Sequence, residues 1–301
     1  MEREQIRISV RNLVEFILRS GDIDNRRASL DTMEAMQAGS RLHRKIQKKM
    51  GSTYHAEVPL NIIIEEENYE LGIWGRADGI IIEETVTIDE IKGVYLSLDL
   101  LEEPVKVHLA QAKCYAYIYG IQNDLQKINV QMTYGNLDTG DLKYFSYEYS
   151  MQQLQEWFSD LILKYKKWAD FQYEWRKKRQ ASIKELAFPF PYREGQKELA
   201  AGVYRTIARK KNLFIQAPTG VGKTISTLYP AIKAVGEGLG DKIFYLTAKT
   251  VTANVAKETL GILCEKGYRA KSVQITAKEK LCPCEEVDLS LIHISEPTRP
   301  Y

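Results

Sequence analysis

The chain has 301 residues, which is more than one ordinary domain needs and enough for two. Its 44% hydrophobic and 27% charged residues are typical of a folded globular protein and exclude a disordered chain. A net charge of +2 is too small to indicate a nucleic-acid partner by itself. No apolar run reaches the roughly 18 residues that a membrane helix requires, so the sequence predicts a cytoplasmic protein with no membrane span.

Hydrophobic periodicity predicts an alternation of helices and strands in the first two thirds of the chain. Helical spacing of apolar residues predicts helices over residues 6–18, 33–50, 104–120 and 151–184. Short β-rich runs bounded by turn residues or charges predict strands at 57–64, 69–75, 79–82, 85–92, 127–134 and 142–149. The prolines at 189 and 191 end the long helix and place a domain boundary there, so we expect one domain at 1–186 and a second at 187–288.

The long helix alternates aromatic and basic residues and ends in a basic run. The aromatic residues are Trp157, Phe158, Tyr165, Trp168, Phe171, Tyr173 and Trp175, and the basic run is 176–179. Two interpretations stay open. The basic end contacts a DNA backbone, or it is a solvated helix end whose aromatic residues pack on the core.

The four cysteines fall into two groups. Cys114 and Cys264 lie alone in apolar, helix-like contexts typical of core residues, whereas Cys282 and Cys284 flank a proline in a loop. After Asp288, residues 289–299 read LSLIHISEPTR, which resembles a translated sequencing adapter. We therefore expect 289–301 to be a non-native tail.

Asp78, Glu90 and Lys92 form a candidate site for phosphodiester cleavage. Such a site needs carboxylates that hold a divalent ion and a positive or basic group near the attacking water. The alternation of side chains in a strand puts Glu90 and Lys92 on one face, and a tight strand pair would bring Asp78 to them. Oxygen ligands of this kind suit Mg or Mn. If the register slips by one residue, Asp89 replaces Glu90.

With His43 upstream and Gln111 and Tyr115 downstream, this series resembles the RecB-like PD-(D/E)xK nucleases. Those enzymes carry a helix His, a strand Asp, a Glu/Asp-x-Lys and a Gln-x-x-x-Tyr in this order. The resemblance implies that His43, Asp78, Glu90 and the backbone carbonyl of Ile91 hold the metal. It also implies that Lys92 positions or activates water and that Gln111 and Tyr115 line the site and contact DNA. Glu57 stays open between a site carboxylate and a solvated strand end.

The second domain carries a phosphate-binding pattern. Residues 212–224 read NLFIQAPTGVGKT, which predicts a strand, a glycine-bearing loop and a helix start whose N–H groups can bind phosphates. Lys223 would reach the β- and γ-phosphates of ATP, and Thr224 would hold Mg. Ala217 replaces the usual first glycine, a form that resembles superfamily 2 helicases. The expected ATP-binding residues are Arg193, Gln196, Pro218, Thr219, Gly220, Val221, Gly222, Lys223 and Thr224, with Arg193 and Gln196 as the adenine-reading motif.

Two further segments resemble superfamily 2 helicases of the XPD/DinG type. Residues 242–250 look like the next strand and the DNA-contacting motif after it. Cys282 matches the first ligand of the family's 4Fe-4S cluster, whose other ligands would lie beyond Asp288 in a full-length protein.

The expected fold class is therefore α/β. It comprises a PD-(D/E)xK nuclease domain, with a mixed sheet flanked by helices, followed by an incomplete P-loop RecA-like helicase lobe. The resemblance implies an ATP-dependent DNA helicase and nuclease of repair or recombination, acting on DNA that is single-stranded or has single-stranded ends. ATP is expected to bind but not to be hydrolysed, because the later motor motifs are absent. The alternatives are an inactive nuclease fold that clamps DNA for the helicase, and an RNA-directed or regulatory ATPase.

Overall fold

The computed structural model describes residues 3–20, 32–95, 97–218, 220–248 and 250–276. Thr219, Cys282, Cys284 and the expected tail at 289–301 lie outside the described residues. The described chain forms two compact units, one up to Asp170 and one over Phe171–Thr276. The division falls inside a long helix rather than at residue 186, where the sequence pattern placed the domain boundary.

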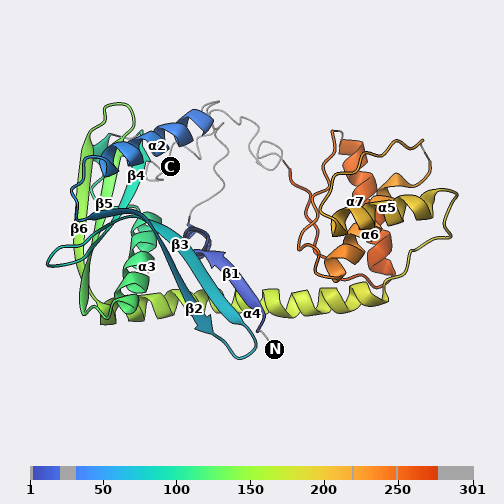
Figure 1. Cartoon of the computed structure of the whole chain (residues 1–301), viewed down its shortest axis with the longest axis horizontal. Helices are drawn as coiled ribbons and strands as arrows, with labels where there is room; N and C mark the ends of the chain where they lie inside the picture. Colours follow the sequence, from blue (N-terminus) through green and yellow to red (C-terminus); the bar gives the residue numbers. More distant parts are fainter. Residues whose placement is uncertain (1–2, 21–31, 96, 219, 249, 277–301) are drawn as a thin grey trace. The chain divides into compact units, whose positions relative to one another are not determined.

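The first unit contains a six-stranded mixed sheet (Figure 1). Its strands are β1 (Gln5–Ser9), β2 (Tyr54–Glu65), β3 (Glu70–Ile81), β4 (Thr87–Val94), β5 (Lys127–Asn136) and β6 (Leu142–Ser150). The order is β1-β3-β4-β5-β6, and β2 pairs along the whole length of β3. The β1/β3 and β4/β5 pairs are parallel and the others are antiparallel. This confirms the predicted mixed sheet.

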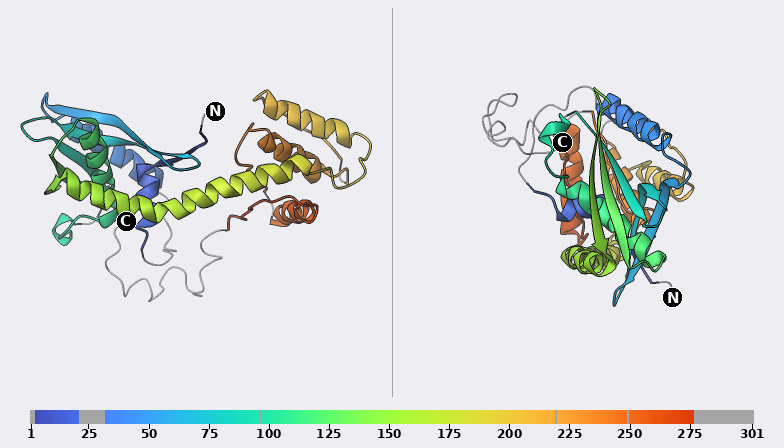
Figure 2. Two further views of the ribbon diagram at one scale, coloured as in Figure 1. Left: turned by 90° about the horizontal axis from the view of Figure 1, so that it is seen from below. Right: turned by 90° about the vertical axis from the view of Figure 1, so that its left-hand side faces the viewer.

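Helices cover the two faces of this sheet. They are α1 (Val10–Ile17), α2 (Thr32–Gln47), α3 (Lys106–Gln122) and α4 (Met151–Glu185). α3 packs against β4 and β5, whereas α2 lies on the opposite side of the sheet from α3 and the first half of α4 (Figure 2). Apolar side chains of β5, among them Val130 and Met132, are fully buried. The sheet is therefore enclosed where β4 runs between α2 and α3.

The first predicted helix is only partly a helix. Residues 5–9 form β1, which pairs with the first residues of β3, and α1 begins at Val10. The Ser9 hydroxyl accepts a hydrogen bond from the N–H of Asn12, so Ser9 caps α1. The prediction was wrong for residues 6–9 because Ile6 fits both a helical spacing with Val10 and a strand alternation with Ile8, and only the edge of β3 decides between them.

Two predicted strands are one. β3 runs without interruption through Gly75 and Gly79, which the sequence suggested as turn residues. A Cβ on Gly75 would lie 2.4 Å from Cε1 of Tyr115, and one on Gly79 would lie 1.9 Å from the hydroxyl of Tyr54. These glycines therefore make room for two tyrosine rings above the strand and do not turn the chain.

The described residues of the second unit form helices joined by segments without regular secondary structure. It contains the end of α4, α5 (Gln196–Ala208), α6 (Lys223–Gly236) and α7 (Thr250–Glu265). Its core consists of Ile183, Leu186, Ile225, Ile232, Val235, Leu263 and Tyr268. None of the described helices in either unit is long and apolar enough to cross a membrane.

The strands predicted at 212–216 and 242–247 are absent from the described part of the second unit. Both segments are extended but unpaired, and their apolar side chains are exposed, with Phe214 95% and Leu246 88% accessible. A strand exists only through hydrogen bonds to a neighbouring strand. Apolar sequence alone could not supply that neighbour, so the sheet expected for a RecA-like lobe is missing from these residues.

Candidate metal centre

The candidate site lies where the ladder between β3 and β4 ends. The last bonded pair is Gly79 with Asp89, so Asp78 and Glu90 would come next but are not paired. The N–H of Ile91 instead donates to Oδ2 of Asp78 over 2.9 Å. A side-chain carboxylate thus takes the place of a strand carbonyl, which positions Asp78 between the two strands.

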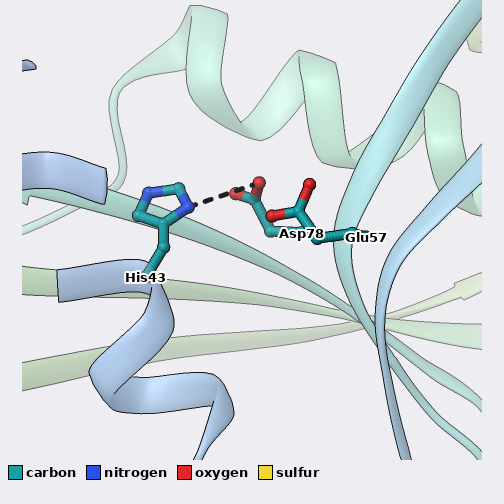
Figure 3. Close-up of side chains that lie close together, drawn as sticks. All are labelled: His43, Glu57 and Asp78. Atoms are coloured by element: carbon teal, nitrogen blue, oxygen red, sulfur yellow. Dashed lines mark ion pairs between the residues drawn. The ribbon is translucent and has the colours of Figure 1, made fainter. Parts of the chain in front are cut away.

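Three possible ligands converge at this point from three different elements (Figure 3). They are His43 of α2, Glu57 of β2 and Asp78 of β3, and one ligand atom from each lies within 4.8 Å of the others. Nδ1 of His43 is 3.5 Å from Oδ1 of Asp78. Gln47, one turn further along α2, donates to Oε1 of Glu57 at 3.2 Å and to the backbone oxygen of Asp78 at 2.9 Å. Gln47 therefore links the Glu57 carboxylate to the backbone of Asp78.

The backbone at Glu57 is strained. Its φ is +56°, a backbone conformation that residues other than glycine rarely adopt and that costs about 1–3 kcal/mol. Ala56 pairs with Gly79 and Val58 with Ala77, so Glu57 lies opposite Asp78 without forming a bonded pair. Two carboxylates opposite each other repel, and the ion pair of Glu57 with Arg76, at 2.7 Å, offsets part of this repulsion. A bound cation would relieve the repulsion.

Glu90 and Lys92 lie on one face of β4, as the alternation predicted. Nζ of Lys92 is 2.5 Å from Oε1 of Glu90 and 3.5 Å from Oε1 of Gln111. Gln111 in turn donates to the hydroxyl of Tyr115 over 3.5 Å. The four predicted residues of β4 and α3 thus form one hydrogen-bonded row.

Glu90 is fully buried, and its Oε2 atom has no hydrogen-bond partner. Burial raises the pKa of this carboxyl to about 8, an effect that the charge of Lys92 opposes and that of Asp78 reinforces. A buried carboxylate oxygen without a partner is costly unless a cation occupies the space beside it.

The residues present fit a divalent ion. Carboxylate oxygens and one imidazole nitrogen suit Mg or Mn, and the unpartnered oxygen of Glu90 and the repulsion between Glu57 and Asp78 both favour a cation. Glu90 is not one of the three converging ligands, and its Oε1 atom accepts a hydrogen bond from Lys92. The expected role of the Ile91 carbonyl stays a prediction, since the bond at Ile91 uses its N–H.

Asp89, the alternative ligand, lies on the opposite face of β4. Its carboxylate accepts hydrogen bonds from the Tyr54 hydroxyl at 3.0 Å, from Gln131 at 3.2 Å and from the Thr133 hydroxyl at 2.5 Å. Burial raises its pKa, although these bonds lower it. Asp89 is thus satisfied by neighbouring strands and links β4 to β2 and β5.

His108 is a half-buried neighbour of the site that the sequence analysis missed. It precedes Gln111 by three residues on α3, and its Nδ1 atom is 3.1 Å from the hydroxyl of Tyr134. Burial lowers its pKa to about 3, and the positive charges of Lys92 and Arg11 act in the same direction. His108 is therefore neutral beside Lys92. Its helical spacing from Gln111 and Tyr115 was the signal that could have found it.

The predicted phosphate-binding residues form a glycine turn followed by a helix. Gly220 and Gly222 have φ values of +87° and +75°, which only glycine adopts without strain, and α6 begins at Lys223. Nζ of Lys223 donates to the backbone oxygens of Ala217 at 3.0 Å and Pro218 at 2.6 Å. The free N–H groups at the start of α6 make such a turn a potential anion site.

Arg193 and Gln196 contact this turn directly. Gln196 is buried, accepts a hydrogen bond from the N–H of Arg193 at 3.0 Å and donates to the oxygen of Val221 at 3.2 Å. The Arg193 guanidinium donates to the oxygen of Gly220. A Cβ on residue 222 would lie 2.5 Å from Nε2 of Gln196, so the close approach of Gln196 also requires Gly222.

Comparisons with known proteins find similarity over a short segment. No family model matches the chain. A stretch of 51 residues, 17% of the chain, is 51% identical to a probable ATP-dependent helicase of Methanocaldococcus jannaschii. The match spans 8% of the length of that curated relative.

Among solved structures, the crystal structure of SSO0001 is similar at a TM-score of 0.34 and 19% identity. The similarity covers 54% of this chain and 78% of that one. It is too distant to carry an argument about the site or the function.

The structure thus brings most of the predicted residues into two groups, one in each unit. His43 and Asp78 meet with Glu57, which the sequence left undecided, and Gln47 joins them. In the second group, Thr224 is the second residue of α6, and its Oγ1 atom accepts from the Tyr245 hydroxyl at 3.5 Å.

Proposed function

We propose that the chain is part of a DNA-processing enzyme of the helicase kind, in which the first unit is a metal-dependent DNA nuclease and the second binds ATP. The observation that carries the nuclease assignment is the meeting of His43, Glu57 and Asp78. The buried, unpartnered oxygen of Glu90 on strand β4 adds support. The sequence identity to a probable ATP-dependent helicase supports the proposal that the enzyme is of the helicase kind. Repair or recombination of DNA is the process that such an enzyme would serve.

His43, Glu57, Asp78 and Glu90 would hold Mg or Mn. When bound, a divalent ion of this kind lowers the pKa of a water molecule and stabilises the charge on the phosphate that is attacked. Gln47 keeps Glu57 and Asp78 in place by its two hydrogen bonds. Glu90 would be ionised only with a metal ion beside it, because burial favours its protonated form despite the charge of Lys92.

Lys92 would put a positive charge next to the attacked phosphate. Its ammonium group lies between Glu90 and Gln111, which fix its position from the strand and from α3. Its N–H groups can donate to a phosphate oxygen or to the attacking water, as cleavage requires. Tyr115 keeps its proton, since burial raises its pKa, so its hydroxyl can donate to DNA.

The test of the nuclease is cleavage of end-labelled DNA by the full chain, with Mn, with Mg and with EDTA. We expect metal-dependent cleavage of single-stranded DNA, and Lys92→Met should lower its rate about 100-fold or more, because one preorganised positive group is lost. Lys127→Met is the control, since Lys127 is an exposed lysine that pairs with Glu148 at 3.0 Å. Cleavage that survives Lys92→Met or persists in EDTA would contradict the proposal.

An inactive nuclease fold that clamps DNA for the helicase is the alternative. The ion pair of Arg76 with Glu57, at 2.7 Å, favours it, because it neutralises a potential ligand. DNA binding by a folded chain that neither binds Mn nor cleaves DNA would support this function.

ATP binding by the second unit is tested at Lys223. We expect Lys223→Ala to weaken binding of a fluorescent ATP analogue with Mg about tenfold or more, because the lysine would contact the β- and γ-phosphates. Lys257→Ala, on the exposed side of α7, should leave the affinity unchanged. Equal affinities of wild type and Lys223→Ala would refute nucleotide binding at this turn.

A 4Fe-4S cluster involving Cys282 in a full-length protein stays a prediction.

A further inference from the structure

The structure divides the aromatic residues of α4 into two sets. Phe158, Tyr165 and Tyr173 are buried and belong to the cores. Trp168 and Phe171 are each 45% exposed, and Trp175 is partly exposed. Trp168 packs edge-on against Phe16, with ring centres 5.3 Å apart, but Phe16 is itself 48% exposed. Burial in the core therefore explains the first set but not the second.

The second set lies on one face of α4 together with lysines. At 100° per residue, a face about 100° wide contains six side chains over a helix length of about 21 Å. They are Lys164, Lys167, Trp168, Phe171, Trp175 and Lys178, which we call the α4 face. All six positions are on a single helix, so the periodicity of that helix alone fixes this arrangement.

Positive charge lies next to the rings. Nζ of Lys167 is 5.5 Å from the ring centre of Trp168, and Nζ of Lys271 is 4.3 Å from Phe171 and 4.9 Å from Trp175. The last two rings are stacked, with centres 6.1 Å apart and planes 16° from parallel. Lys164 forms an ion pair with Asp160 at 2.6 Å. The face therefore combines partly exposed rings with ammonium groups.

The two arginines of the basic end of α4, by contrast, stabilise the fold of the second unit. Arg176 and Arg179 both contact Asp241, Arg176 at 3.2 Å, and Arg179 also donates to the backbone oxygen of Asp241 at 3.1 Å. The contact to DNA that the sequence suggested for residues 176–179 is therefore better placed on the α4 face.

We infer that the α4 face binds single-stranded nucleic acid. Exposed rings can stack on unpaired bases, and lysines beside them can pair with the phosphates of the same strand. A duplex keeps its bases stacked inside and offers no ring face to Trp168 or Phe171. The lysines complement a polyanion and not an apolar protein segment. The inference rests on the proposed function only in taking DNA as the substrate.

The test is the affinity of the full chain for a fluorescein-labelled oligo-dT strand, measured by anisotropy in EDTA so that no cleavage occurs. The double variant Trp168→Ala/Phe171→Ala should bind about tenfold more weakly or worse, since each stacked ring contributes to affinity. Trp168→Tyr keeps a ring and should retain most of the affinity, whereas Trp168→Leu keeps only apolar area and should not. Tyr144→Ala removes an equally exposed ring from β6 and is the control.

The salt dependence tests the lysines separately. Lys164→Ala/Lys167→Ala should reduce the slope of log affinity against log salt concentration by about 1.4, at about 0.7 per lost phosphate contact. Unchanged affinity in the ring variants, an unchanged salt slope, or equal losses for a blunt duplex would each overturn the inference. Because cleavage is not measured, these outcomes are independent of whether the metal centre cleaves DNA.

Discussion

Asp78→Asn is expected to abolish metal-dependent DNA cleavage, with a loss of roughly a thousandfold or more, because a carboxylate that holds the ion is replaced by a neutral amide. Asp78 is central to the site. One of its oxygens faces His43 at 3.5 Å, and the other accepts from the N–H of Ile91 at 2.9 Å. An amide can orient its oxygen toward either His43 or the N–H of Ile91 but not toward both, and its NH2 group would repel a metal ion. The fold should persist, since the side chain keeps its size.

The measurement combines Mn titration by calorimetry with single-turnover cleavage of labelled DNA. Asp124→Asn is the matched control, because Asp124 is exposed and has a φ of +51°, which asparagine also tolerates. The control should bind Mn and cleave as wild type does. If Asp78→Asn bound Mn with wild-type affinity, His43, Glu57 and Asp78 would not be the metal centre.

Glu90→Gln is expected to raise the free energy of unfolding of the metal-free chain while abolishing cleavage. The ordinary pKa of the carboxyl is 4.5, and burial raises it in the folded chain to about 8. Between these values the unfolded carboxyl loses its proton and the folded one keeps it. Stability therefore falls as pH rises from about 4.5 to about 8. Glutamine carries no charge, so near pH 7 the variant should gain on the order of a few kcal/mol.

The check is urea denaturation in EDTA at a series of pH values from 5 to 8. Wild type should lose stability along the series more steeply than Glu90→Gln, whose amide oxygen can still accept from Lys92. Added Mn should stabilise wild type and have little effect on the variant, because binding of a cation ionises Glu90. Parallel pH profiles for the two proteins would show that Glu90 is not held protonated in the metal-free fold.

Local patterns determined the parts of this protein that depend on one element at a time. Alternation along residues 87–94 put Glu90 and Lys92 on one face of β4 and Asp89 on the other, as the hydrogen bonds of these residues show. The glycines of the 212–224 pattern predicted a loop before a helix start, and Gly220 and Gly222 form a turn with positive φ values directly before α6. Such features follow from the period of a single strand or the conformational freedom of a single residue.

Only the tertiary structure decided the features that depend on a neighbour. Glu57 joins the metal centre because the register of β2 on β3 puts it opposite Asp78, and no sequence spacing encodes that register. Residues 5–9 are a strand because β3 offers them an edge, whereas residues 212–216, equally apolar, have no edge and form none. Hydrogen bonding between strands and burial between elements are properties of pairs, so they appear only when both partners are in place.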